Sequence, residues 1–161
     1  MTASTTYVSG QVLTAGNMNS LPWGIVDATA GGTSGRGWVQ STTGYLVPTT
    51  VADVTSMTIT FTPVTGRLYR ARYTSRIDCN STAQLLTAQI TNASNTVLQE
   101  RQVFPTASQS DIMDIEVILT GLSGSTTLKV RAVAGTIANS YFNAGATSPM
   151  QFMVEDIGPS T

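Results

Sequence analysis

The chain has 161 residues, a formal net charge of −1 and no histidine, and only 11% of its residues are charged. This length suits one domain that buries roughly 70% of its extended surface, and the charge gives no electrostatic basis for binding nucleic acid. The absence of histidine removes the commonest general base and the commonest metal ligand, so no cofactor or metal is expected.

Hydroxyl side chains take the place of the missing charges, because 27 residues are threonine and 16 are serine. Threonine is β-branched and suits the exposed side of a pleated strand. The hydrophobic content of 41% argues against a disordered Ser/Thr/Gly-rich chain. The composition therefore predicts an all-β protein.

Targeting and redox features point to assembly inside a cell. Cys79 is the single cysteine, so the chain forms no internal disulfide and no cysteine-based zinc site, and we expect a small semi-buried side chain there. No run of about 18 apolar residues is present, which argues against a membrane span. The first residues lack the basic start and apolar core of a secretory signal, so we expect the protein to remain in the cytoplasm until it is assembled or released.

The first segment, residues 1–27, is predicted to be an anchoring arm that precedes a β-domain at residues 28–161. Thr14 suits the cap of a short helical turn through Asn19, and Pro22 ends it. The arm carries more apolar side chains than a free tail tolerates. We expect it to dock either on its own domain or on a neighbouring subunit through Leu13, Met18, Asn19, Leu21 and Trp23.

Residues 28–37 are rich in glycine but lack both the G-x-G-x-x-G and the Gly-Lys-Ser patterns of phosphate-binding loops. A flexible connector is the default interpretation. Residues 38–40 and 44–47 are predicted to be short strands on either side of a turn, and residues 48–55 a loop.

A β-hairpin is predicted at residues 57–77. Its first arm alternates apolar residues with threonine, from Met57 to Phe61, which is the period of a half-buried strand. Pro63 and Gly66 bracket a four-residue connection. The second arm places four apolar side chains on one side, so the hairpin needs a second layer to cover that side. They are Tyr69, Ala71, Tyr73 and Ile77.

Further strands follow at intervals of about ten residues, separated by turn sequences. The predicted strands are residues 83–91, 96–104, 111–120, 128–132 and 137–142, and a last one from residue 150 that ends at Gly158-Pro159. The facing of residues 96–104 is ambiguous, because Gln99 and Arg101 lie between Val97 and Val103. Eight to ten short strands of this spacing predict a single β-sandwich or jelly roll.

Three arginines form a stripe on the polar side of the central segment: Arg70, Arg72 and Arg76. One interpretation is a surface that grips an anionic partner. The other is a cross-strand ladder with Asp114 and Glu116, whose i, i+2 spacing matches that of the arginines, within one chain or across an interface.

No catalytic constellation emerges from the sequence, and we expect the protein not to be an enzyme. The paired carboxylates of a glycoside hydrolase have two candidates, Asp114 with Glu116 and Glu155 with Asp156. The first pair shares one strand face, and the second is adjacent in sequence, so its members point to opposite faces. No histidine is present to activate a nucleophile, and no G-x-S-x-G elbow occurs.

Aromatic side chains near Gly/Asn/Ser loops offer a different function, because sugars stack on aromatic rings. The candidate glycan contacts are Trp38 and Tyr141, with Tyr45 and Phe142 close by in the sequence. Such residues also serve as core plugs and loop anchors.

Two short segments resemble proteins of tailed bacteriophages. Residues 10–19, GQVLTAGNMN, resemble a "vLTAadmN" motif near the start of small virion proteins of phages that infect actinobacteria, with Gly16 where the pattern more often has alanine. Residues 152–159, FMVEDIGP, resemble a closing motif of some of the same proteins. The resemblance implies a minor tail, head-fibre or decoration protein, with an arm that attaches to the virion and a β-domain that is often trimeric.

The sequence supports two main functions. The first is a non-enzymatic component of a tailed-phage virion, a homotrimer that contacts other virion proteins through the arm and is assembled in the host cytoplasm. The second is a carbohydrate-binding module that recognises host surface glycans. A third, a hydrolase, requires turnover that depends on Glu116.

Overall fold

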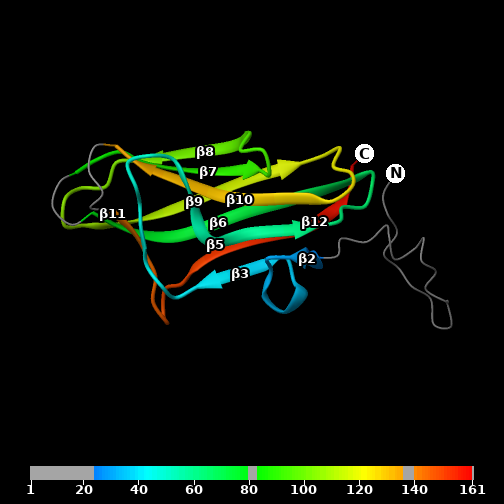
Figure 1. Ribbon diagram of the computed structural model, residues 1–161, viewed down its shortest axis with the longest axis horizontal. Coiled ribbons are helices and arrows are strands. Elements are labelled where there is room, and N and C mark those ends of the chain that lie inside the picture. Colours follow the sequence, from blue (N-terminus) through cyan, green and yellow to red (C-terminus); the bar gives the residue numbers. More distant parts are fainter. Residues whose placement is uncertain (1–23, 80–82, 136–139, 161) are drawn as a thin grey trace.

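The computed structural model describes residues 24–79, 83–135 and 140–160, and it shows an all-β protein in which two antiparallel sheets pack face to face (Figure 1). The predicted β-sandwich is confirmed. Within these residues no helix is long and apolar enough to cross a membrane.

The larger sheet has seven strands and is built around β6, which is 13 residues long. One edge of β6 pairs with β9, and the other edge is shared by β12 and β11. β12 in turn pairs with β1 and β3, and β11 pairs with β4. The bounds are β1 Gly24–Ile25, β3 Trp38–Ser41, β4 Tyr45–Leu46, β6 Arg67–Cys79, β9 Ser110–Leu119, β11 Ser140–Asn143 and β12 Met150–Pro159.

The smaller sheet has five strands in the order β2-β5-β10-β7-β8. Their bounds are β2 Ala28–Ala30, β5 Ala52–Phe61, β7 Leu86–Asn92, β8 Val97–Val103 and β10 Thr126–Ala134. β7 and β8 form the hairpin expected from their spacing. The Asn92 carboxamide holds its turn by accepting from the backbone N–H groups of Ser94 and Thr96 at 3.0 and 2.9 Å.

The core lies between the sheets and consists of the apolar side chains that alternate along each strand. Its largest fully buried members are aromatic: Phe61, Tyr73, Phe142 and Phe152. The alternation predicted for residues 111–120 is confirmed at Met113, Ile115 and Leu119, while Val117 is half-buried. Cys79 is buried and carries no disulfide.

The predicted hairpin at residues 57–77 is wrong, because its two arms belong to different sheets. β5 pairs with β2 and β10, whereas β6 lies in the opposite layer. The connection crosses the sandwich at buried Pro63, and the Tyr69 hydroxyl accepts from the Val64 backbone N–H at 2.7 Å. The apolar faces of the two arms therefore cover each other, as the Phe61 and Tyr69 rings do at 5.3 Å. Apolar and polar residues alternate in the same way in two strands of one hairpin and in two strands that face each other across a sandwich, so the sequence pattern does not distinguish the two arrangements.

The short strands predicted at residues 38–40 and 44–47 correspond to β3 and β4. They do not pair with each other; β3 pairs with β12, and β4 pairs with β11. The predicted loop at residues 48–55 already contains the first residues of β5. The predicted strand at residues 137–142 corresponds to β11, and its first three residues lie outside the described part of the chain.

The glycine-rich segment at residues 28–37 is a packed turn, not a flexible connector. It contains β2 and a 3-10 turn, and it returns to the sheet where Arg36 bridges to Asp27. A Cβ atom at Gly32 would lie 1.6 Å from the Arg36 carbonyl oxygen, and one at Gly37 would lie 2.4 Å from a methyl group of Val26. Gly32 and Gly37 are thus required by close packing.

Most of the predicted arm, including its helical turn, lies outside the described residues. Its last residues take part in the sandwich. Gly24 pairs with Asp156, Ile25 pairs with Glu155, and Val26 is buried.

Close packing of the turn predicts that a methyl group added at a packed glycine lowers the stability of the fold more than one added at an open glycine. Gly32→Ala forces a methyl group against backbone and should destabilise the fold by about 1–3 kcal/mol. Gly145→Ala is the matched control, because Gly145 also has an ordinary φ and a Cβ atom there would meet nothing within 4 Å. Urea unfolding followed by tryptophan fluorescence measures both changes, and equal midpoints would contradict the packed turn.

Candidate functional site

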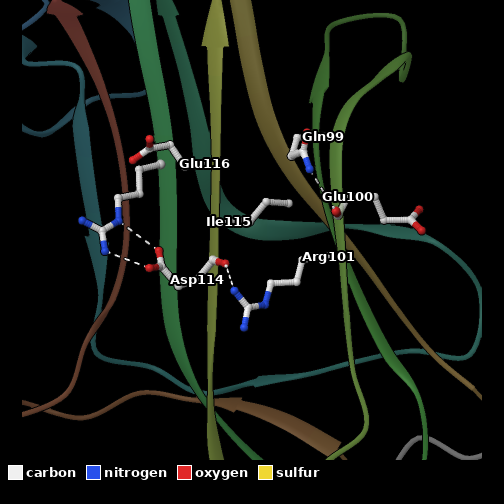
Figure 2. A pocket seen from close by; sticks show the side chains of 7 residues that line it. Gln99, Glu100, Arg101, Asp114, Ile115 and Glu116 are labelled. Atoms are coloured by element: carbon white, nitrogen blue, oxygen red, sulfur yellow. Dashed lines mark hydrogen bonds and ion pairs between the residues drawn. The ribbon is translucent and has the colours of Figure 1, made fainter.

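A surface groove of about 610 Å³ lies between two edge strands, β8 of the smaller sheet and β9 of the larger one. Its lining residues are Arg72, Gln99, Glu100, Arg101, Asp114, Ile115 and Glu116. Figure 2 shows Asp114, Ile115 and Glu116 on β9 and Gln99, Glu100 and Arg101 on β8, with the Arg101 side chain reaching across toward Asp114. The groove thus brings together Arg72, Asp114 and Glu116 from the predicted site and adds three residues of β8.

The Arg72–Asp114 ion pair dominates one wall. The guanidinium donates to both carboxylate oxygens, from Nε at 2.9 Å and from Nη2 at 2.8 Å. These hydrogen bonds hold the pKa of Asp114 below its usual value, and they raise the pKa of Arg72. Glu116 is directly opposite Arg72 in the strand register and adds its charge to the same guanidinium.

Arg101 crosses the groove from β8 and donates through Nη1 to the Asp114 backbone carbonyl at 3.0 Å (Figure 2). This carbonyl lies on the edge of β9 that no strand of the described chain covers. Arg101 therefore satisfies a backbone acceptor that a further strand would otherwise use. A charged side chain of this kind blunts an exposed sheet edge.

Glu100 is held from both sides by amides, from Gln89 at 2.7 Å and from Gln102 at 2.8 Å. The carboxylates of Glu100 and Asp114 are therefore already engaged by donors of their own chain. No group of three or more Cys, Asp or Glu side chains suitable for a metal ion occurs in the described ranges. The groove consequently resembles a structural ion-pair network more than an acid–base pair.

Of the predicted arginine ladder with Asp114 and Glu116, the Arg72–Asp114 pair is present. Arg70 does not pair with Glu116; it donates from Nε to Glu155 on β12 at 2.8 Å. The reason is that the direct cross-strand neighbour of Arg70 on β9 is Ile118, while Glu155 is its neighbour on β12. Arg76 pairs with Asp78 of its own strand at 3.0 Å.

These pairs lie on the outer face of the seven-stranded sheet, which we term the ladder face. Side chains that alternate with buried ones point outward there. Its charged residues are Arg70, Arg72, Arg76, Asp78, Asp114, Glu116 and Glu155. Its apolar and aromatic residues are Ile25, Trp38, Leu46, Ile112, Ile118, Tyr141 and Met153.

The two candidate glycan contacts are both half-buried on the ladder face but lie far apart. Trp38 pairs with Met153 beside Arg72, and Tyr141 pairs with Asp78. Six residues of β6 separate these positions, or about 20 Å at the usual rise of a strand. The structure does not bring the two rings into one stacking platform, and Phe142 is buried in the core.

A second feature is the corner where β1 meets the end of β12. Arg67 donates from Nε to the Asp156 carboxylate at 2.5 Å, and both side chains are almost completely buried. The other Asp156 oxygen accepts from the Gly158 backbone N–H at 3.0 Å. A pocket of about 240 Å³ opens at this corner, with Ile25, Val64 and Tyr69 among its walls.

The other predicted contact residues belong to the arm, and Leu13, Met18, Asn19, Leu21 and Trp23 lie outside the described residues. The sequence reasoning missed Arg101 and the Arg67–Asp156 pair. The sequence signal that could have revealed Arg101 is the interruption of the apolar pattern by Gln99 and Arg101, since charged and polar side chains are typical of an edge strand.

No known protein family matches the chain, and no curated protein matches it. Among solved structures it is similar to infectious bursal disease virus, Gx strain, with 12% identity, a TM-score of 0.47 and coverage of 87% of this chain and 34% of that one. An arabinose-bound MgGH51 α-L-arabinofuranosidase matches with 13% identity, a TM-score of 0.32 and coverage of 74% and 23%.

A xylan-binding CBM22-1 domain of Paenibacillus barcinonensis Xyn10C matches with 10% identity, a TM-score of 0.27 and coverage of 79% of this chain and 89% of that domain. The chain thus spans about a third and a quarter of the length of the first two structures. Similarity at this level describes neither the activity nor the partners of this chain.

The pairing pattern predicts which arginine is coupled to Asp114. In a double-mutant cycle, Arg72→Ala and Asp114→Ala should show a coupling of about 0.5–1 kcal/mol in urea unfolding, the range for partly exposed pairs. The control cycle of Arg70→Ala with Asp114→Ala should show coupling near zero, because Arg70 pairs with Glu155. Equal coupling in the two cycles would contradict the assignment.

The lowered pKa of Asp114 predicts its contribution to acid unfolding. The folded-state pKa lies below the unfolded value of about 3.9, so the ion pair stabilises the fold fully above about pH 5. This stabilisation is lost as the pH falls through the folded-state pKa. Between pH 5 and pH 2 Asp114→Asn should therefore lose less stability than the wild type, as measured by urea midpoints. A steeper loss of stability in Asp114→Asn than in the wild type would refute this contribution of Asp114.

Proposed function

We propose that the protein is a structural subunit of a tailed-phage virion, attached through its N-terminal residues and displaying the β-sandwich. The observation that carries this proposal is spatial. The two segments that resemble phage proteins lie at opposite ends of the sequence, yet β1, which begins five residues after the end of the first segment, is paired with the second. Gly24 and Ile25 of β1 are hydrogen-bonded neighbours of Asp156 and Glu155 in β12.

Four residues of the closing segment have structural tasks at this corner. Val154 is buried in the core, Glu155 pairs with Arg70 on the outer face, and Asp156 pairs with buried Arg67. Gly158 has a φ of +119°, which admits the irregularity between Asp156 and Gly158 in the pairing of β12 with β6. The closing segment therefore holds β12 in its register beside β6, the central strand of the larger sheet.

This geometry suits attachment by the arm. A load applied to residues before Gly24 passes through β1 into β12, which is hydrogen-bonded to β6 over most of its length. In Figure 1 the start of the described chain and the end of β12 lie at the same end of the sandwich. The rest of the domain projects away from this end and is available for display.

We also propose that the subunit has no catalytic role. The chain contains no histidine, and the carboxylates of Asp114 and Glu100 are engaged by Arg72, Gln89 and Gln102. The carbohydrate-binding alternative has less support, because Trp38 and Tyr141 are separated along β6 and form no joint platform. A glycan array that detects binding lost on Trp38→Ala would restore that alternative.

The attachment hypothesis is tested in particles of the phage that encodes the chain. Tagged wild-type protein supplied during infection should appear in purified virions, as detected by mass spectrometry. The double variant Leu13→Asp, Met18→Asp should be at least tenfold depleted from virions, because its arm carries charge where apolar contacts are expected. Its circular dichroism spectrum should match that of the wild type.

Thr5→Asp is the matched control, since it adds charge to the same arm outside the motif. Two results would contradict the proposal. One is the absence of wild-type protein from the virions, and the other is equal incorporation of the double variant and the control.

A further inference from the structure

The two outer faces of the sandwich differ in character. The described residues expose eight large hydrophobic side chains, and four of them lie on the ladder face. Ile112 and Ile118 are 60% and 50% exposed, and Leu46 and Ile25 are 44% and 37% exposed. The outer face of the five-stranded sheet exposes one, Val97, and otherwise presents mainly hydroxyl, amide and charged groups.

The apolar residues of the ladder face are distributed over it in rows. One row across the strands runs from Ile118 through the Arg70–Glu155 pair to Ile25. The next runs from Glu116 through Arg72 to Met153 and Trp38. Aliphatic, methionine and aromatic side chains interleaved with arginine are the composition of a protein–protein interface core, where lysine is depleted.

The charge balance of the ladder face favours an identical chain as its partner. Three arginines and four carboxylates nearly cancel, and each of the three arginines is paired in the plane of the sheet, with Glu155, Asp114 and Asp78. A nearly neutral face neither attracts a strongly charged partner nor repels an identical one. Because the guanidinium groups keep their carboxylate partners on burial, covering the face leaves none of these three arginines unpaired.

The size of the face agrees with association of copies. From Leu68 to Asp78, β6 is about 33 Å long, and four strands span about 19 Å. Side-chain relief makes the accessible area larger than this flat footprint, which brings it close to the ~800 Å² per partner of a stable interface.

We propose that the ladder face packs against a second copy of this chain. The proposal goes beyond attachment through the arm and holds without it, since it uses only side chains of the sandwich. In this arrangement the outer face of the five-stranded sheet remains exposed to solvent. The homotrimer implied by the phage resemblance and a dimer both satisfy it, provided that the ladder face forms the contact.

The test is sedimentation velocity of the full chain over a hundredfold concentration range. The wild type should sediment as an oligomer. Ile118→Lys and Ile112→Lys, at the two ends of β9, should each raise the dissociation constant at least about 30-fold, because each places an unpaired charge in the contact. Val97→Lys is the matched control, since Val97 is a β-branched residue of the other edge strand with 45% exposure, and it should leave the oligomer intact.

Circular dichroism and urea midpoints establish that the variants remain folded, and two exposed positions guard against a local defect in one of them. A wild type that stays monomeric throughout the range would overturn the proposal. So would an oligomer that survives both isoleucine changes, or one that Val97→Lys alone dissociates. A monomer in which, in a Trp23→Phe background, deletion of residues 1–23 shifts the fluorescence of Trp38 would overturn it in favour of the chain's own arm.

Discussion

The buried Arg67–Asp156 ion pair constrains the whole seven-stranded sheet. Both side chains are withdrawn from water, so removal of either partner leaves a buried charge without its counter-ion, at a cost of about 3–5 kcal/mol. The pair joins the first residue of β6 to the irregularity in β12. It therefore fixes the relative position of the two strands on which the other five depend.

The register of β6 and β12 determines what each side of the sheet presents. With Asp156 facing inward, Val154 and Phe152 enter the core, and Glu155 and Met153 face outward. A shift by one residue would move every side chain of β12 to the other side. The buried pair, the Arg70–Glu155 pair and the apolar rows of the ladder face are thus consequences of one alignment.

Periodicity predicted which side chains are buried, but not which strands are neighbours. The alternation of Ile59, Phe61, Tyr69 and Tyr73 was correctly assigned to the core, because a strand with one apolar face must cover that face. Whether the next strand joins the same sheet or the opposite one is decided by the connection, where Pro63 is buried as the chain crosses between layers.

The candidate site was predictable to a similar degree. Matched i, i+2 spacing suggested a ladder of arginines with Asp114 and Glu116 but did not say which side chains pair. The partner of Arg70 lies on β12, 85 residues away in sequence, and spacing within one strand carries no information about it. The packed glycine turn was missed for a related reason. Glycine permits both flexibility and close backbone approach, and only the neighbouring chain, here the Arg36 carbonyl at Gly32, distinguishes the two.

The central place of β12 has a consequence for synthesis of the protein. β1 and β3 leave the ribosome early, yet both are completed only by β12, which follows every other strand in the sequence. A chain that stops before β12 cannot pair β1 or bury Arg67 against its partner. The corner next to the arm therefore forms only in a chain that has been synthesised as far as β12.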